Sequence, residues 1–133
     1  MTKILTVDQD TDVLRLLRIK LGAAGYAVTR ARDGQEALAA LQATADARPD
    51  VVITELLLPD MAGTDLIAQL AMLPVPPLIV VLSSLDSDAA MAASLAAGAA
   101  DYVTKPFSPQ ALLERVRVNL MRAGQGAQAT AEG

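Results

Sequence analysis

The sequence contains no cysteine and no histidine, and its only aromatic residues are two tyrosines and one phenylalanine. Without cysteine the chain cannot form disulfides, thiolate metal sites or a cysteine nucleophile. Without histidine it lacks the commonest general base, the commonest zinc ligand and any triad built on histidine. Because 53% of the residues are hydrophobic and only 2% are aromatic, the core must be built from aliphatic side chains.

The chain also lacks an excess of positive charge. Its formal net charge is −4, so it carries no electrostatic footprint for nucleic acid. Its longest apolar runs are about half the roughly 20 residues that span a bilayer, and its N-terminus leads straight into a strand pattern without the layout of a signal peptide. At 133 residues it suits one domain. We expect a cytoplasmic protein that binds neither nucleic acid nor membrane.

Five short apolar segments alternate with five helical patterns along the chain. This strict alternation predicts an α/β fold, a doubly wound parallel sheet of five strands with helices on both faces. The number and length of the helices suit the flavodoxin-like strand order 2-1-3-4-5. The expected strands are 3–7, 26–31, 50–54, 78–82 and 101–104, and the expected helices are 11–21, 34–47, 63–73, 87–97 and 109–122.

The domain is expected to span residues 1–122, and the sequence shows no internal repeat. Residues 123–133 are small and polar and have nothing to bury. We therefore predict a flexible tail, or the start of a linker, over 123–133.

Polar side chains stand where four of the expected strands end. They are Asp8 with Gln9, then Glu55, Ser83 and Lys105. In an open parallel sheet these ends face one crevice. Acids can hold Mg²⁺ there, while a lysine and a hydroxyl contact phosphate oxygens, which is a set suited to phosphoryl transfer. Each of these residues alone is more simply explained as a surface residue, but their joint occurrence favours one site.

Three segments and one spacing resemble a response-regulator receiver domain of two-component signalling. The segments are KILTVD at 3–8, ELLLP at 55–59 and GAADYVTKPF at 98–107, and Lys105 follows Ser83 by 22 positions. The resemblance covers about residues 3 to 122. It implies a fold like that of the chemotaxis regulators and an aspartate that accepts a phosphoryl group from a histidine kinase.

The resemblance also assigns roles to individual residues. Asp8 matches the first of two Mg²⁺-binding acids, Ser83 the switch hydroxyl, Tyr102 the aromatic residue that reports activation, and Lys105 the phosphate-contacting lysine. The peptide bond before Pro106 is expected to be cis, as the family implies and as such a turn permits.

Two departures from the family pattern fall on the chemistry. Glu55 stands at the phosphoacceptor position and Gln9 at the second acidic position, while a third departure, Ala62, lies in a loop. Glutamate carries its carboxylate about 1.5 Å further out, and a misplacement of about 1 Å can cost roughly 10²-fold in rate. Gln9 offers a metal no charge, so a Mg²⁺ site on Asp8 and Glu55 is weakened.

The sequence therefore favours an atypical receiver, not an enzyme, that acts as a protein–protein interaction module with Glu55 in place of the phosphorylatable aspartate. One alternative is a receiver that still accepts a phosphoryl group from a histidine kinase with Mg²⁺. Another is a flavodoxin-like small enzyme or nucleotide binder, which is disfavoured because no Gly-rich phosphate loop follows the first strand.

The resemblance implies a surface for a histidine kinase or an output protein, formed by helix 87–97, strand 101–104 and helix 109–122. Val118 and Met121 lie off the inward stripe of the last helix, which adds a homodimer as a possibility. Arg115, Arg117 and Arg122 are interpreted as a solvated face and not as a nucleic-acid site.

Overall fold

The computed structural model describes the backbone of residues 1–132 and the side chains of residues 1–124. The five strands form one sheet in the order β2-β1-β3-β4-β5, and every neighbouring pair is parallel. The predicted doubly wound fold and its strand order are therefore confirmed. The strands are β1 (Lys3–Val7), β2 (Ala27–Ala31), β3 (Val51–Thr54), β4 (Leu78–Ser83) and β5 (Asp101–Thr104).

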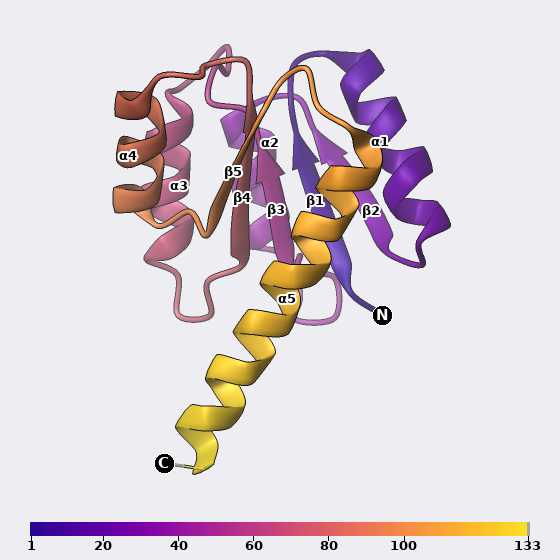
Figure 1. Cartoon of the computed structure of the whole chain (residues 1–133), viewed down its shortest axis with the longest axis vertical. Coiled ribbons are helices and arrows are strands. Elements are labelled where there is room, and N and C mark those ends of the chain that lie inside the picture. Colours follow the sequence, from indigo (N-terminus) through magenta and orange to yellow (C-terminus); the bar gives the residue numbers. More distant parts are fainter. Residues whose placement is uncertain (133) are drawn as a thin grey trace.

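Helices cover both faces of the sheet, with α1 and α5 on one face and α2, α3 and α4 on the other (Figure 1). Their bounds are α1 (Thr11–Ala23), α2 (Gly34–Leu41), α3 (Gly63–Ala71), α4 (Asp88–Ala97) and α5 (Pro109–Glu132). Among the described residues, no helix is both long enough and apolar enough to cross a membrane.

The core consists of two aliphatic layers, one on each side of the sheet. All four residues of β3 are buried, as expected for a strand covered on both faces. Ile53 packs with Leu17 of α1 and Leu112 of α5 on one side, and Val52 packs with Leu66 of α3 on the other. The central strands are thereby fixed, and so are the positions of the residues that follow them.

Helix α2 is shorter than the sequence suggests, so the expected end near Ala47 was wrong. The helix ends at Leu41 and Gln42 caps it. Downstream, the amide groups of Ala47 and Arg48 both donate to the carbonyl oxygen of Thr44, at 2.9 and 3.0 Å, in a separate turn. Thr44 is β-branched and a poor helix former, so this local turn replaces further helix.

Helix α5 is longer than expected, since it continues to Glu132 instead of ending near Arg122. Residues 123–132 contain no proline, and four of the ten are alanine, the residue with the strongest helix propensity. The side chains beyond residue 124 lie outside the described part of the chain. The assignment of 123–133 as a flexible tail or linker stays a prediction.

Candidate functional site

Four strands deliver polar side chains to one edge of the sheet. Asp8 follows β1, Glu55 follows β3, Ser83 ends β4 and Lys105 follows β5. Backbone hydrogen bonds continue the strand pairing to these positions: the Glu55 amide donates to the Val7 carbonyl at 3.0 Å, and the Lys105 amide donates to the Ser83 carbonyl at 2.8 Å. Each of the four side chains is therefore positioned by the sheet itself.

The Glu55 carboxylate is buried and is fully engaged by donors. Its Oε1 accepts hydrogen bonds from the Ser83 hydroxyl, from the Leu56 amide at 2.9 Å and from the Leu57 amide at 3.2 Å. Its Oε2 accepts from the Lys105 ammonium at 2.9 Å. The side chain keeps only 6% of its exposure, so these protein groups replace water around the charge.

Lys105 joins two buried carboxylates. Its Nζ lies 2.6 Å from Asp8 Oδ2 and 2.9 Å from Glu55 Oε2. The other oxygen of Asp8 accepts the Asp10 amide at 2.9 Å. Two negative charges thus share one positive charge in a largely desolvated space, where ion pairs count for more than at the surface.

The pKa values of the pair move apart in the directions that keep both groups charged. Burial on its own would raise the pKa of Glu55, but hydrogen bonds from Ser83, Lys105 and Leu57, together with the charge of Lys105, outweigh it and lower this pKa. Burial would lower the pKa of Lys105, but its hydrogen bonds and its attraction to Asp8 and Glu55 raise it. Glu55 is therefore a carboxylate and Lys105 an ammonium at neutral pH.

A chain of hydrogen bonds leads from Glu55 toward β5. The Ser83 hydroxyl donates to Glu55 and accepts the Leu85 amide at 3.2 Å. The Leu85 carbonyl in turn accepts the Tyr102 hydroxyl at 2.5 Å. Burial, together with the charges of Glu55 and Asp86, raises the pKa of Tyr102. The hydroxyl therefore stays a donor.

Gln9 does not join this cluster. It is exposed, and no hydrogen bond of its side chain occurs among the described residues. Its neighbour Asp10 is occupied as the N-cap of α1, where its carboxylate accepts the amides of Asp12 and Val13. The sequence predicted Gln9 in the site because it adjoins Asp8. The strand ends at Val7, however, and Gln9 lies beyond it at an exposed position.

The residues present do not fit a Mg²⁺ site in this arrangement. Within the part of the chain that the structure describes, no group of three or more carboxylate, histidine or cysteine side chains is placed to hold a metal ion. The two carboxylates that the sequence suggested, Asp8 and Glu55, both point an oxygen at the Lys105 ammonium. A cation would have to displace that lysine, and Gln9 adds no ligand.

The peptide bond between Lys105 and Pro106 is cis, the isomer that the resemblance predicted. It directly follows the lysine that joins the two carboxylates.

The sequence missed the role of Asp60, in the loop after Glu55. Its carboxylate accepts the amides of Gly34 and Gln35 at 2.8 and 2.9 Å, which joins this loop to the N-terminus of α2. The hydrogen bond from Gly34, aided by that from Gln35, lowers the pKa of Asp60. In the sequence Asp60 is only an acidic residue in a loop. Such residues are common, so nothing indicated that this one would accept hydrogen bonds from a helix N-terminus.

Arg115 is also more than a solvated residue. Its guanidinium contacts Asp101 through two nitrogens, at 2.5 and 2.7 Å, and Asn119 donates to the same carboxylate at 2.9 Å. Burial opposes but does not cancel these hydrogen bonds, which lower the pKa of Asp101. The network ties β5 to α5 next to Tyr102.

Comparisons with known proteins agree with this geometry. The family model described as response regulator receiver domain matches residues 4–117. The chain is 43% identical over 122 residues to the transcriptional regulatory protein KdpE of Mycobacterium tuberculosis, with 92% of this chain and 52% of KdpE covered. It is 35% identical over 121 residues to the alkaline phosphatase synthesis transcriptional regulatory protein PhoP of Bacillus subtilis, with 91% of this chain and 49% of PhoP covered.

The chain thus spans about half the length of the curated relatives it matches. Among solved structures, it is similar to a CheY-like response regulator receiver domain protein from Methanospirillum hungatei. That comparison has a TM-score of 0.87 and 29% identity, and covers 95% of this chain and 98% of the other. The relatives named here are regulators, and none is named as a flavin or nucleotide enzyme.

Proposed function

This chain belongs to the response regulator receiver domain family, and we propose that it is an atypical receiver acting as a protein–protein interaction module. In this proposal Glu55 stands where a phosphorylatable aspartate would be and carries a permanent charge. The domain signals through its binding surfaces, without a cycle of aspartate phosphorylation.

One observation carries the proposal: the Glu55 carboxylate uses the donors that a bound phosphoryl group would need. The family resemblance gives Ser83 and Lys105 as the phosphate-contacting groups, and both already bind Glu55. The amides of Leu56 and Leu57 complete the set. An incoming phosphoryl group would therefore compete with the side chain for every one of these donors.

The length of glutamate supports the same conclusion. Its extra methylene carries the carboxylate about 1.5 Å further from the backbone, and this reach brings it to Lys105 and Ser83. In-line attack on a phosphorus atom depends on positioning, and an error of about 1 Å can cost roughly 10²-fold. Both oxygens of the carboxylate are already held, Oε1 by a hydroxyl and two amides and Oε2 by Lys105.

The charge at the site resembles that of a weakly activated receiver. Glu55 supplies −1, whereas a phosphoryl group supplies about −1.5 to −2. The hydrogen-bond path from Glu55 through Ser83 and Leu85 to Tyr102 is a route by which this fixed charge orders the segment before α4.

We also propose that Mg²⁺ binds weakly or not at all, because Lys105 holds the oxygens of Asp8 and Glu55 that would face it. Titration with Mg²⁺, followed by amide NMR signals of residues 8–10, 55–57 and 105, tests this. Saturable shifts at these positions in the millimolar range would contradict it and would favour a phosphorylation-competent receiver.

A second candidate is a receiver that remains competent for phosphorylation. The observation in its favour is that Asp8, Ser83 and Lys105 of the family pattern lie together around the carboxylate at position 55. A partner kinase would then have to supply the geometry and the cation affinity that this chain lacks.

The experiment that tests the proposal is incubation with acetyl phosphate and Mg²⁺, followed by intact-mass measurement. We expect no phosphorylated species, either in the wild-type protein or in Glu55→Gln. A stoichiometric species in the wild type that disappears in Glu55→Gln would reject the module and establish the phosphorylation-competent receiver.

For the interaction surface we propose the face formed by α4, β5 and α5. In α4 only Ser94 is buried, so the helix presents most of its length outward. Leu95, Val118 and Met121 are 51%, 40% and 63% exposed. A histidine kinase, an output protein or a second copy could cover this face, and these partners imply a cytoplasmic location. If the wild type forms a homodimer through this face, Met121→Glu should disrupt it. Sedimentation would then give a lower molecular mass for the variant than for the wild type.

A further inference from the structure

A cavity of about 280 Å³ lies at the opposite edge of the sheet from the acidic cluster, between the loop before β3 and the loop before β4. Five residue steps along an extended chain separate Asp50 from Glu55, roughly 16 Å, so the two sites are distinct. The cavity is lined by Ala45, Arg48, Pro49, Asp50, Val75, Pro76 and Pro77.

Arg48 is the one cation among the lining residues, and no described side chain of opposite charge pairs with it. It is half-buried, its Nε is shielded from solvent without any hydrogen bond, and it takes part in none of the ion pairs formed by the described side chains. Burying such a group without a partner is unfavourable. The terminal nitrogens of the same guanidinium are not shielded in this way, and an anion in the cavity would pair with them.

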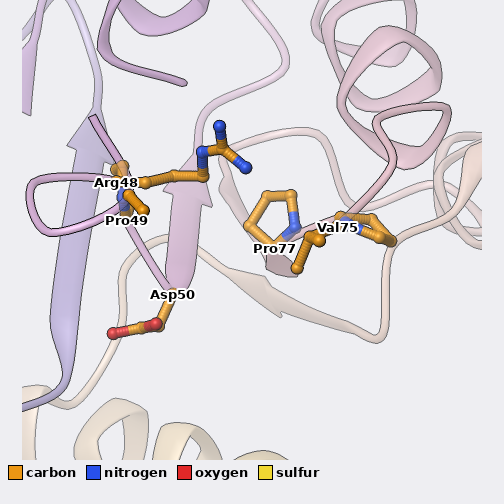
Figure 2. A pocket seen from close by; sticks show the side chains of 7 residues that line it. Arg48, Pro49, Asp50, Val75 and Pro77 are labelled. Carbon is orange, nitrogen blue, oxygen red and sulfur yellow. The ribbon is translucent and has the colours of Figure 1, made fainter. Parts of the chain in front are cut away.

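The other charged lining residue does not neutralise Arg48. Figure 2 shows the Asp50 carboxylate directed away from the Arg48 guanidinium, which extends toward the Pro77 side of the cavity. Asp50 is instead engaged by the Lys3 amide, which donates to its Oδ2 at 2.8 Å. The wall thus offers one positive group for contact, while the nearby negative charge disfavours an anion of more than one charge.

The remaining walls are apolar and rigid. Pro49 and Pro77 are buried, and their rings fix the backbone at both loops. The Leu78 amide donates to the Asp50 carbonyl at 2.9 Å, which holds the two loops together at the cavity's edge. Val75, 66% exposed, is an apolar group with little of its own surface buried. A cavity of this kind is preformed and so needs little reorganisation to bind a ligand.

We propose that this cavity binds a small monocarboxylate with a branched aliphatic body. The carboxylate pairs with Arg48, and the body packs against Pro49, Val75 and Pro77. The volume equals that of about nine water molecules at about 30 Å³ each, enough for an acid of about five carbons. This site is independent of the function proposed for Glu55, so either can fail without the other.

Titration of the protein with 3-methylbutanoate, followed by amide NMR signals, tests the site. Saturable shifts are expected at residues 45–48, 50, 75 and 78. Arg48→Gln should weaken binding at least tenfold, and 3-methylbutan-1-ol, which has the same body without the charge, should bind at least tenfold more weakly. Arg18→Gln is the matched control, because Arg18 is an exposed arginine beside a different groove, and it should leave binding unchanged.

Val75→Glu provides a second variant that leaves Arg48 in place. It adds a carboxylate to the wall at an exposed position, so repulsion should abolish binding. Val75→Glu therefore still tests the site if Arg48→Gln unfolds the domain. Shifts that grow linearly without saturation, that persist in Val75→Glu, or that concentrate around Arg15, Arg18 and Arg30 would overturn the proposal.

Discussion

The acidic cluster contains two carboxylates, Asp8 and Glu55, and one ammonium, Lys105. Its balance of charge therefore depends on Lys105. Its side chain retains 19% exposure, against 5% for Asp8 and 6% for Glu55. If the lysine were removed, the two carboxylates would be left close together with no counter-charge. The residues of the cluster are therefore coupled, and substitutions within it will not be additive.

Lys105→Met should lower the free energy of unfolding at pH 7 by about 2 kcal/mol. This is less than the roughly 3–5 kcal/mol of a broken, fully buried pair, because Lys105 keeps some contact with water. Urea denaturation measures the change. The control is Lys20→Met, because Lys20 forms no ion pair among the described side chains. This substitution should change the free energy of unfolding by less than about 0.5 kcal/mol. Equal effects of the two substitutions would contradict the role given to Lys105.

The pH dependence of stability follows from the lowered pKa of Glu55. A carboxyl with a lower pKa in the folded state stabilises the fold above its unfolded value, about 4.5, and this contribution disappears as the pH falls through the folded pKa. Asp60 and Asp101 act in the same direction, so the wild type alone does not isolate Glu55.

Comparison with Glu55→Gln isolates the contribution of Glu55 to the pH dependence of stability. The difference in unfolding free energy between wild type and Glu55→Gln should be constant from pH 7 to about 5 and should change below about pH 4.5, to the disadvantage of the wild type. A difference that stays flat down to pH 3, measured by urea denaturation, would mean that the pKa of Glu55 is not lowered.

At the scale of elements, helix ends and loops determine how the cluster is held. Asp10, Asp33 and Ser87 each cap a helix as N-cap with a side-chain hydrogen bond, a position that these residue types favour. The end of α2 and the hydrogen bonds from Gly34 and Gln35 to Asp60 could not be predicted from the sequence. Each depends on contacts with residues that are distant along the chain.

Helix α3 is the exception among these caps. Its N-cap is Ala62, which has extended backbone angles and no side-chain hydrogen bond to the helix. Ala62→Asp should therefore raise the free energy of unfolding by about 1 kcal/mol. Ala62→Ser should act in the same direction, and no gain in thermal or urea denaturation from either variant would show that the cap is satisfied in another way.

Gly63, the first residue of α3, packs directly against the segment that carries Glu55. A Cβ at this position would lie 2.8 Å from the Glu55 carbonyl oxygen and closer still to the Leu56 Cα, which are backbone atoms that cannot move aside. Gly63→Ala should cost about 3 kcal/mol. At Gly22, within α1, a Cβ meets nothing within 4 Å, so Gly22→Ala should be neutral or stabilising by up to about 1 kcal/mol.

At the scale of the whole molecule, the periodicity of the sequence was enough to predict the sheet. The alternation of buried strands and amphipathic helices leaves few arrangements, and the observed order is the predicted one. The convergence of Asp8, Glu55, Ser83 and Lys105 followed from the topology, since the carboxyl ends of parallel strands share an edge.

What the sequence could not predict was the side-chain geometry at that edge. Which oxygen of Glu55 meets Lys105, and that Gln9 turns outward, depend on rotamers and loop paths set by the surrounding packing. The same holds for the orientation of Arg48 at the opposite edge. The side-chain geometry of Glu55, Lys105 and Gln9 decides whether the cluster can act as a phosphoryl acceptor.

The most direct test of the central claim is to restore the family pattern and compare phosphorylation. The double variant Gln9→Asp, Glu55→Asp shortens the acceptor and returns the second acid. Wild type and double variant are incubated together with acetyl phosphate and Mg²⁺ and analysed by intact mass. We predict one added phosphoryl group on the double variant and none on the wild type. Equal phosphorylation of both proteins at position 55 would contradict it.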